Sequence, residues 1–177
     1  MSLLPSIKYP VGIQTFSKII EGEYLYIDKT RLVWQLANTF SYVFLSRPRR
    51  FGKSLLISTL QAYFEGRKEL FAGLEMERLE EKWIQYPVLR FDLSGTSYSN
   101  PEDLSDKISA YLTRLEKAYG IEPEKQIGDR FYNVIEAAYR KTGRKVVILI
   151  DEYDKPMLDT LHDTPLHDSV KSSLRGF

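Results

Sequence analysis

The spacing of apolar residues along this chain alternates between the two-residue repeat of β-strands and the longer repeat of α-helices. Short apolar runs predict strands at residues 24–27, 42–45, 88–93 and 146–150. The last run contains no polar residue, which is typical of a strand covered on both faces. We expect these four segments to supply the sheet of the molecule.

Helical spacing fills the intervals between these runs. Leu104, Ile108, Leu112 and Leu115 recur on one helical face, behind a start signal at Asn100. The predicted helices are residues 31–39, a segment from Lys53 towards Gly66, 78–85, a segment from Pro101 to Gly120, 127–141, and a last one beginning at Pro156. Strands that alternate with helices predict an α/β fold with a mainly parallel sheet and right-handed crossovers.

Composition adds constraints on size and partners. With 177 residues, of which 43% are hydrophobic, the chain is expected to form one soluble globular domain. The 25 basic and 24 acidic residues leave a net charge of +1, so no global field favours nucleic acid or a membrane surface. A signal sequence and a bilayer-spanning run are both missing from the pattern, which makes the cytoplasm the expected compartment.

Metal chemistry is narrowed by the same composition. The chain has no cysteine, and its two histidines, His162 and His167, lie in a polar stretch where we expect them to be solvated. Thiolate catalysis and cysteine zinc sites are therefore excluded. Any metal should be a hard cation held by oxygen atoms.

The predicted strand at residues 42–45 runs into a candidate phosphate loop. Gly52, Lys53 and Ser54 match the end of the Walker A pattern G-x-x-x-x-G-K-[ST], while Arg47 stands in place of its first glycine. In this pattern the glycine lets the backbone approach the phosphates, Lys53 reaches the β- and γ-phosphates, and Ser54 binds magnesium. The expected nucleotide-binding residues are Arg47, Pro48, Arg49, Arg50, Phe51, Gly52, Lys53, Ser54 and Leu55.

The three arginines of this loop have more than one interpretation. Arg47, Arg49 and Arg50 are suited to neutralising the charge of a triphosphate. They are also suited to salt bridges across the loop, or to contacts with a nucleic-acid backbone. A nucleic-acid partner is the weakest of these alternatives, because no further basic and aromatic residues extend the patch.

The strand at residues 146–150 delivers two acids, Asp151 and Glu152, in the Walker B form. Ligands collect at the carboxyl edge of the sheet in open α/β folds. We expect Asp151 to hold magnesium and Glu152 to act as the general base for the attacking water. Asp92 ends the preceding strand, where its surroundings are more typical of a simple turn.

Four blocks of sequence resemble the bacterial AAA-ATPase-like family, whose members often carry a PD-(D/E)XK nuclease-like domain after the ATPase region. The family's phosphate loop bears arginines, so the resemblance accounts for Arg47. The blocks are YPVGI at 9–13 with Phe16, YIDKT at 26–30, FLSRPRRFGKS at 44–54 and ILIDEYDKP at 148–156.

The resemblance implies a P-loop NTPase-like three-layer fold. Residues 1–40 would be a lead-in with a short strand and helix, and residues 41–177 the ATPase core. It also implies that Phe177 precedes a further strand, which carries a polar sensor residue and lies between the two motif-bearing strands. We therefore expect these 177 residues alone to have a disturbed or partner-completed sheet and to hydrolyse ATP poorly.

The leading hypothesis is an ATP-binding, magnesium-dependent ATPase of AAA-like type that hydrolyses the β–γ phosphoanhydride bond. A second hypothesis is a nucleotide-sensing module that regulates an attached nuclease-like or other effector domain. A third is a small-molecule phosphotransferase, although no lid signature supports it. Oligomerisation remains compatible with all three.

Overall fold

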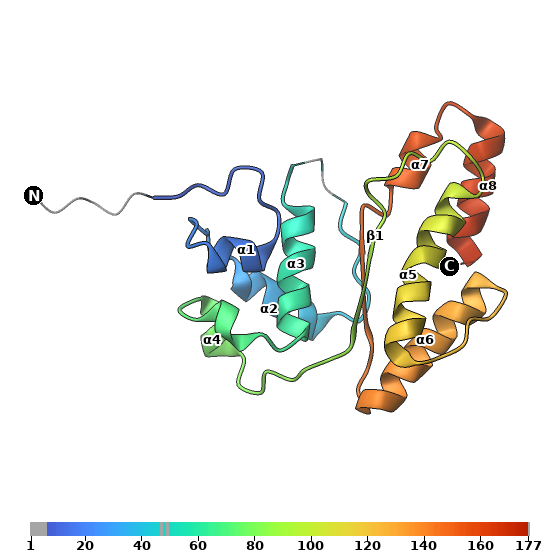
Figure 1. The fold of residues 1–177 in the computed structure, drawn as a ribbon. Coiled ribbons are helices and arrows are strands. Elements are labelled where there is room, and N and C mark those ends of the chain that lie inside the picture. Colours follow the sequence, from blue (N-terminus) through green and yellow to red (C-terminus); the bar gives the residue numbers. More distant parts are fainter. Residues whose placement is uncertain (1–6, 47, 49, 177) are drawn as a thin grey trace, which may run out of the picture. The chain divides into compact units, whose positions relative to one another are not determined.

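The computed structural model describes residues 7–46, 48 and 50–176. The chain divides into two compact units, Met1–Tyr86 (the N-terminal unit) and Pro87–Phe177 (the C-terminal unit), each with its own elements (Figure 1). The N-terminal unit contains α1 (Phe16–Glu21), α2 (Thr30–Thr39), α3 (Lys53–Phe64), the 3-10 helix η1 (Lys68–Phe71) and α4 (Glu75–Leu79). The C-terminal unit contains β1 (Val88–Asp92), α5 (Asp103–Tyr119), α6 (Ile127–Thr142), β2 (Val147–Asp151), α7 (Lys155–Asp159) and α8 (Thr164–Gly176).

In the N-terminal unit, α3 packs against both α1 and α2. Ser58, on the buried face of α3, accepts a hydrogen bond from the backbone N–H of Phe16 at 2.9 Å and so attaches the start of α1. Leu60 and Tyr63 of α3 are buried, whereas Leu56 is only partly buried. The buried apolar residues of this unit are Phe16, Ile19, Val33, Leu60, Ala62, Tyr63, Leu70, Phe71 and Met76.

Two of the predicted strands do not form. Residues 42–45 have no strand structure, and Tyr42 is 95% exposed. The segment at 24–27 is reduced to a single bridge between Tyr24 and Lys8. An apolar run becomes a strand only where it joins a sheet, and residues 42–45 do not belong to the two-stranded sheet of the described residues.

The predicted helix at residues 78–85 is also wrong. The helix found there, α4, ends at Leu79, and Trp83 adopts a positive φ of 42°. Beyond it the chain returns to α3, where the N–H of Tyr86 donates to the carbonyl of Phe64 at 2.7 Å. Aromatic packing of Trp83 against Tyr63 accompanies this return, so tertiary contacts override the local helical preference.

The C-terminal unit is built on a two-stranded parallel sheet, as the two apolar runs predicted. β1 and β2 pair over their whole length, from Val88 opposite Val147 to Asp92 opposite Asp151. Two further helices, α5 and α6, connect the strands, because parallel neighbours need a crossover. The molecule is therefore a mixed α/β protein.

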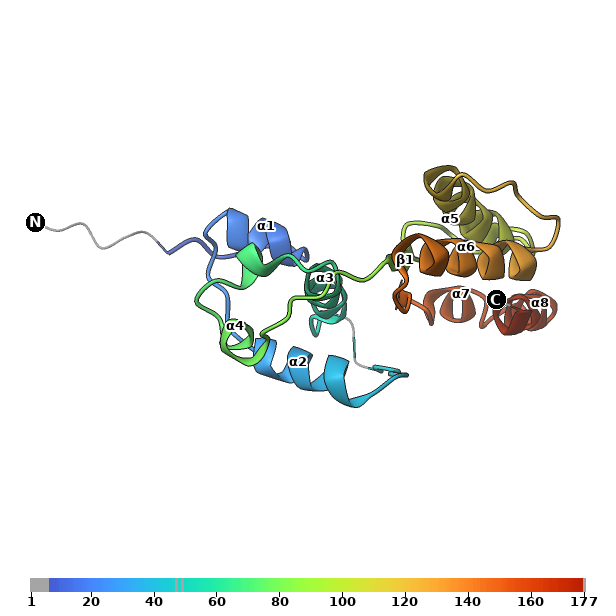
Figure 2. The same ribbon diagram turned by 90° about the horizontal axis from the view of Figure 1, so that it is seen from below.

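The helices of this unit lie on one side of the strand pair (Figure 2). Leu89 and Phe91 of β1 are fully buried among them. The expected stripe on α5 faces the same core, with Leu104, Ile108 and Leu112 buried. The core of buried residues consists of Leu89, Phe91, Leu93, Tyr98, Leu104, Ile108, Leu112, Val134 and Val170.

An ion pair joins α5 to α6 within this unit. The guanidinium of Arg130 contacts the carboxylate of Glu116 at 2.8 Å, and both side chains are almost fully buried. Arg130 also donates to the hydroxyls of Ser109 and Thr113. A buried pair of this kind needs such additional hydrogen bonds to offset its loss of water.

The predicted start of α5 is displaced. The helix begins at Asp103 instead of directly after Asn100, and the Asp103 carboxylate accepts the backbone N–H groups of Ser99 and Asn100. At the other end, α5 stops at the predicted Gly120, and Gly120 and Gly143 close α5 and α6 in the left-handed conformation. The predicted helix ends are thus close to those observed, except at the start of α5, where the Asp103 side chain binds the preceding loop.

Helix α8 was not predicted, although its signals are present. Asp163 accepts the N–H of Leu166 at 3.1 Å, as an N-cap side chain does, and Val170 is the buried residue of the helix. His167 on this helix is half-buried, with Nδ1 3.2 Å from the Thr160 hydroxyl, so the expectation that it is solvated is wrong. His162 is exposed, as expected.

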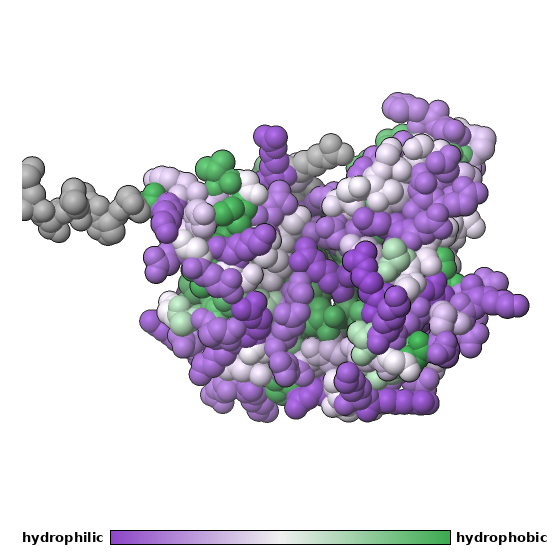
Figure 3. Space-filling view, viewed as in Figure 1, coloured by the Kyte–Doolittle hydropathy of each residue, from purple (hydrophilic) through white to green (hydrophobic). Residues whose placement is uncertain are grey.

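Hydrophilic residues predominate on the surface seen in Figure 3, with hydrophobic residues in small separate groups. Among the described residues, none of the helices has the length and apolar character needed to cross a bilayer.

Candidate functional site

The phosphate-loop candidate belongs to the N-terminal unit and enters α3 through two left-handed residues. Arg50 has a φ of 68° and Gly52 a φ of 76°. Left-handed residues of this kind occur in loops and nests whose backbone N–H groups bind anions. Arg47 and Arg49 lie outside the described residues, and Pro48 is exposed.

Lys53 is the first residue of α3, and Ser54 and Leu55 complete the start of its first turn. As far as the structure is described, this turn contains no acidic residue and no side-chain cap. The partial positive charge of the helix N-terminus is therefore not offset by a nearby carboxylate in that turn. This end of a 12-residue helix is suited to receive an anionic group.

The acidic strand end belongs to the C-terminal unit. Asp151 is the last residue of β2, with its side chain 4% exposed, and its backbone carbonyl accepts the N–H of Leu93 at 3.0 Å. Glu152 follows with a φ of 54°, which is unusual for a residue other than glycine. Strained backbone of this kind is common at functional sites, where neighbouring contacts hold it in place.

Both oxygens of the Asp151 carboxylate have partners within this unit. Oδ1 accepts the backbone N–H of Glu152 at 3.1 Å. Oδ2 lies 3.5 Å from Nη2 of Arg90, on the neighbouring strand β1. Burying a carboxylate costs free energy unless nearby groups compensate its charge. The contacts with Glu152 and Arg90 provide such compensation.

Asp92 stands directly opposite Asp151 in the sheet register. Its Oδ1 accepts the N–H of Ser94 at 2.8 Å, so the turn interpretation is confirmed. Its carbonyl oxygen accepts the hydroxyl of Tyr111 at 3.1 Å. Two aspartates therefore lie at the carboxyl edge of the sheet, and one of them, Asp92, is hydrogen-bonded to the loop that follows it.

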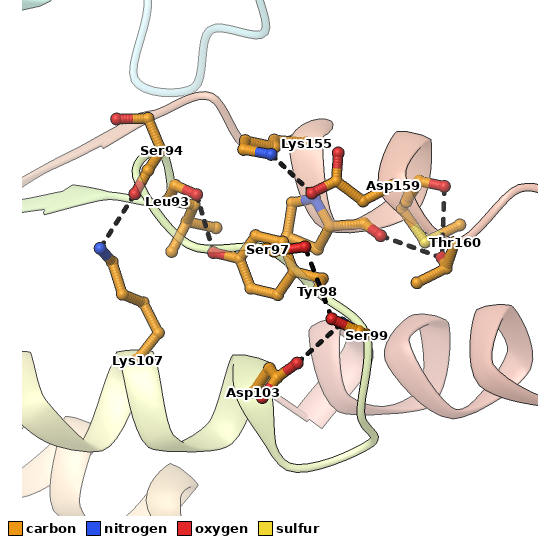
Figure 4. Close-up of polar contacts among 12 residues, drawn as sticks. Leu93, Ser94, Ser97, Tyr98, Ser99, Asp103, Lys107, Lys155, Asp159 and Thr160 are labelled. Carbon is orange, nitrogen blue, oxygen red and sulfur yellow. Dashed lines mark hydrogen bonds and ion pairs between the residues drawn. The ribbon is translucent and has the colours of Figure 1, made fainter.

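The loop after β1 is held by side chains from helices and from the loop itself (Figure 4). Lys107 of α5 donates to the carbonyl of Ser94 at 2.9 Å, and the hydroxyl of Tyr98 donates to the carbonyl of Leu93 at 2.7 Å. Burial raises the pKa of Tyr98 to about 12, so the hydroxyl keeps its proton and remains a donor. Nearby, Lys155 of α7 pairs with Asp159.

Oxygen donors are the metal-ligating groups of these two segments. Among the residues that the structure describes, no group of three or more His, Cys, Asp or Glu side chains could by itself hold a metal ion. Ser54 offers a hydroxyl and Asp151 a carboxylate, which suit magnesium. Magnesium commonly uses one or two protein ligands together with phosphate oxygens, so either oxygen donor, taken by itself, suits a cation that arrives with a nucleotide.

Arg90 is the one residue of this region that sequence reasoning missed. It interrupts the apolar strand Val88–Asp92, and the guanidinium reaches a buried acid on β2. The available signal was a lone charge inside an otherwise apolar strand. Its partner depends on the strand register, which the sequence does not specify.

Comparison with known proteins adds independent findings. A family model described as "Predicted AAA-ATPase" matches residues 10–177. A curated protein from Azotobacter chroococcum mcd 1, described as an uncharacterized protein in the vnfD 5′ region, is 42% identical over 171 residues. The match covers 96% of this chain and 33% of that protein, so the chain spans about a third of its relative's length. No solved structure matches the chain.

Proposed function

This chain belongs to the predicted AAA-ATPase family, and on that premise we propose that it binds ATP with Mg²⁺ and hydrolyses the β–γ phosphoanhydride bond. One observation carries the proposal beyond the family. The left-handed residues Arg50 and Gly52 lead directly into α3, whose first residue is Lys53. A left-handed glycine immediately before a helix that starts with lysine supports a phosphate-binding role for this loop.

Each residue of the loop has a proposed part in binding. Residues 47–55 surround the triphosphate, with backbone N–H groups donating to its oxygens. Lys53 places its ammonium against the β- and γ-phosphates. Ser54 and Asp151 hold the magnesium ion, for which their hydroxyl and carboxylate oxygens are suitable ligands. Bound magnesium would neutralise part of the charge on the phosphate oxygens.

Glu152 is the proposed general base. Its carboxylate would orient the attacking water and accept a proton from it. The positive φ of Glu152 supports this role, because strained backbone conformations cluster at functional sites. The adjacent Asp151 would keep the separate task of binding the cation.

The finer description of the fold is also a proposal. We infer a P-loop NTPase-like three-layer architecture, with residues 1–40 as a lead-in to a core that starts at residue 41. The parallel pair β1–β2 with its helical crossover supports this, since parallel strands joined through helices are the building unit of such folds.

A second candidate is a nucleotide-sensing module that regulates an attached effector. The length of the Azotobacter relative favours it, because this chain matches only 33% of that protein. In this role the domain would bind ATP and turn it over slowly, and an additional domain, such as a nuclease-like one, would carry the output. Measured turnover separates this candidate from the first.

ATP binding and hydrolysis, measured on the protein in the length in which it is naturally made, test the proposal. Lys53→Ala should weaken ATP binding about ten-fold or more, because a charge-assisted contact is lost. Glu152→Gln should keep binding but slow turnover by about 100-fold or more, as loss of a general base does. The predicted result is a variant that retains unhydrolysed ATP.

Matched controls are available on the surface of each unit. Lys18→Ala on α1 and Glu124→Gln between α5 and α6 remove the same groups from exposed positions. Both should behave as wild type. Unchanged binding in Lys53→Ala together with unchanged turnover in Glu152→Gln would rule out this mechanism.

A further inference from the structure

One face of the β1–β2 pair carries charge at the carboxyl edge. Side chains alternate between faces along a strand, and residues paired across a parallel ladder share a face. Arg90 and Asp92 of β1 therefore lie on the same face as Leu149 and Asp151 of β2, their register partners. The opposite face carries Leu89 and its neighbours, buried against the helices.

On this face Arg90 forms an ion pair with Asp151 across the two strands. Nη2 of Arg90 lies 3.5 Å from Oδ2 of Asp151, and the Arg90 side chain is 28% exposed against 4% for Asp151. The aspartate is buried and fixed, whereas the arginine keeps access to water. Of the two groups, the guanidinium is the one that is already in contact with water, so moving it away from the pair costs less desolvation than moving the carboxylate.

Two further acids surround this pair. Asp92 lies directly across from Asp151, and Glu152 follows it in the chain. Asp92 is partly engaged by the N–H of Ser94, which does not remove its negative charge. The region is therefore one that attracts cations, and the Arg90 guanidinium provides part of the compensation.

We propose that Arg90 is the counter-ion of Asp151 in the metal-free protein and is displaced when a divalent cation binds that carboxylate. The inference rests on the proposed function, which assigns Asp151 to magnesium. The two cations contend for the same oxygen, Oδ2, while Oδ1 remains held by the N–H of Glu152. A bound dication repels the guanidinium. The Arg90–Asp151 attraction and the metal–Asp151 attraction therefore weaken each other.

This role makes Arg90 a positioning residue. It keeps the buried carboxylate oriented until metal arrives, and it limits binding of metal alone. A purely structural ion pair would share the first property but not the second. The affinity for a divalent cation without nucleotide is thus the measurement that tells the two apart.

The first test is a double-mutant cycle in EDTA, with Arg90→Met and Asp151→Asn and urea unfolding as readout. Arg90→Met should raise the unfolding equilibrium constant about ten-fold more in the presence of Asp151 than in the Asn variant, because only the ionised acid loses its counter-ion. Equal effects in both backgrounds overturn the proposal.

The second test uses Mn²⁺ alone as the probe, followed by electron paramagnetic resonance. Arg90→Met should tighten Mn²⁺ binding about five-fold, and Asp151→Asn should abolish it. Arg140→Met, which removes an exposed arginine paired with Glu136, is the matched control and should change neither result. Unchanged or weaker Mn²⁺ binding in Arg90→Met overturns the proposal.

Arg90→Lys keeps a charge at this position and guards against failure of the methionine variant to fold. In the double-mutant cycle, Arg90→Lys should retain more than half of the coupling free energy between position 90 and Asp151. It should also bind Mn²⁺ with the affinity of wild type. A lysine variant that behaves like Arg90→Met in both measurements overturns the proposal. Neither test uses nucleotide, so an absence of ATP turnover would reject the proposed function without altering the Arg90–Asp151 coupling.

Discussion

Gly52 shows how one residue fixes the geometry of the candidate phosphate loop. Its φ of 76° lies in the left-handed region, and a Cβ added there would meet no described atom within 4 Å other than those of the adjacent residues. A side chain at this position is therefore opposed by backbone strain and not by crowding. The open space beside Gly52 is where the proposed phosphate would approach.

Gly52→Ala is expected to lower the free energy of unfolding by about 1 kcal/mol, the cost of a left-handed alanine. It should also weaken ATP binding about ten-fold, because the new methyl group occupies the phosphate's approach. Urea unfolding and equilibrium binding of ATP with Mg²⁺ measure the two effects.

Gly73→Ala is the matched control for this prediction. Gly73 has a φ of 79° and equally open surroundings, but it lies outside the loop. The two variants should lose similar stability, and only Gly52→Ala should lose affinity. Equal affinity in both would mean that the phosphate does not approach Gly52.

At the scale of elements, Asp28 attaches the start of α2 to the start of α4. Its Oδ1 accepts the N–H and the hydroxyl of Thr30, at 2.8 and 2.7 Å, and its Oδ2 accepts the N–H of Glu75 at 2.7 Å. Burial raises the pKa of Asp28, but the hydrogen bonds from Thr30 and Glu75 outweigh burial and lower the pKa overall.

The sign of the pH dependence follows from this lowered pKa. A carboxyl group with a folded-state pKa below its unfolded value of about 3.9 adds stability above that value, and the stability is lost as pH falls through the folded pKa. Asp28→Asn should therefore cost about 1–2 kcal/mol at pH 7. Between about pH 4 and pH 2 the difference from wild type should shrink.

Chemical unfolding at several pH values tests this prediction. Asp168→Asn, at an exposed position of α8, is the control and should leave the stability close to that of wild type. A difference between wild type and Asp28→Asn that stays constant from pH 7 to pH 2 would contradict the assignment.

At the scale of the whole molecule, each compact unit has its own buried core. Leu112 is fully buried in the C-terminal unit, and Leu70 is 3% exposed in the N-terminal unit. Separate cores allow separate opening reactions, since hydrogen exchange reports cooperative units that often coincide with such packing.

Leu112→Ala is expected to lower the exchange protection of residues 87–177 by about 2–5 kcal/mol, through a cavity in that core. Protection of residues 8–86 should fall by less. Leu70→Ala should give the reverse pattern, and each variant serves as the control of the other. Hydrogen exchange measured by mass spectrometry tests this prediction. Equal losses of exchange protection in both units from either variant would show a single cooperative core.

Elements with strong local signals were predictable from the chain alone. The stripe of α5 and the left-handed closures at Gly120 and Gly143 depend on residues within a few positions of each other. The same holds for β2, whose unbroken apolar run ends at Asp151 as expected. Local spacing and capping therefore determined which segments are helices and where the acidic pair stands.

Only the tertiary structure decided which of these segments meet. Residues 42–45 are apolar enough for a strand, yet in the described part of the chain they do not join the sheet, and their backbone is irregular. Arg90 reaches Asp151 because of the β1–β2 register, and Trp83 ends a helical pattern by packing on Tyr63. Such contacts join positions far apart in sequence, and hydropathy and capping do not encode them.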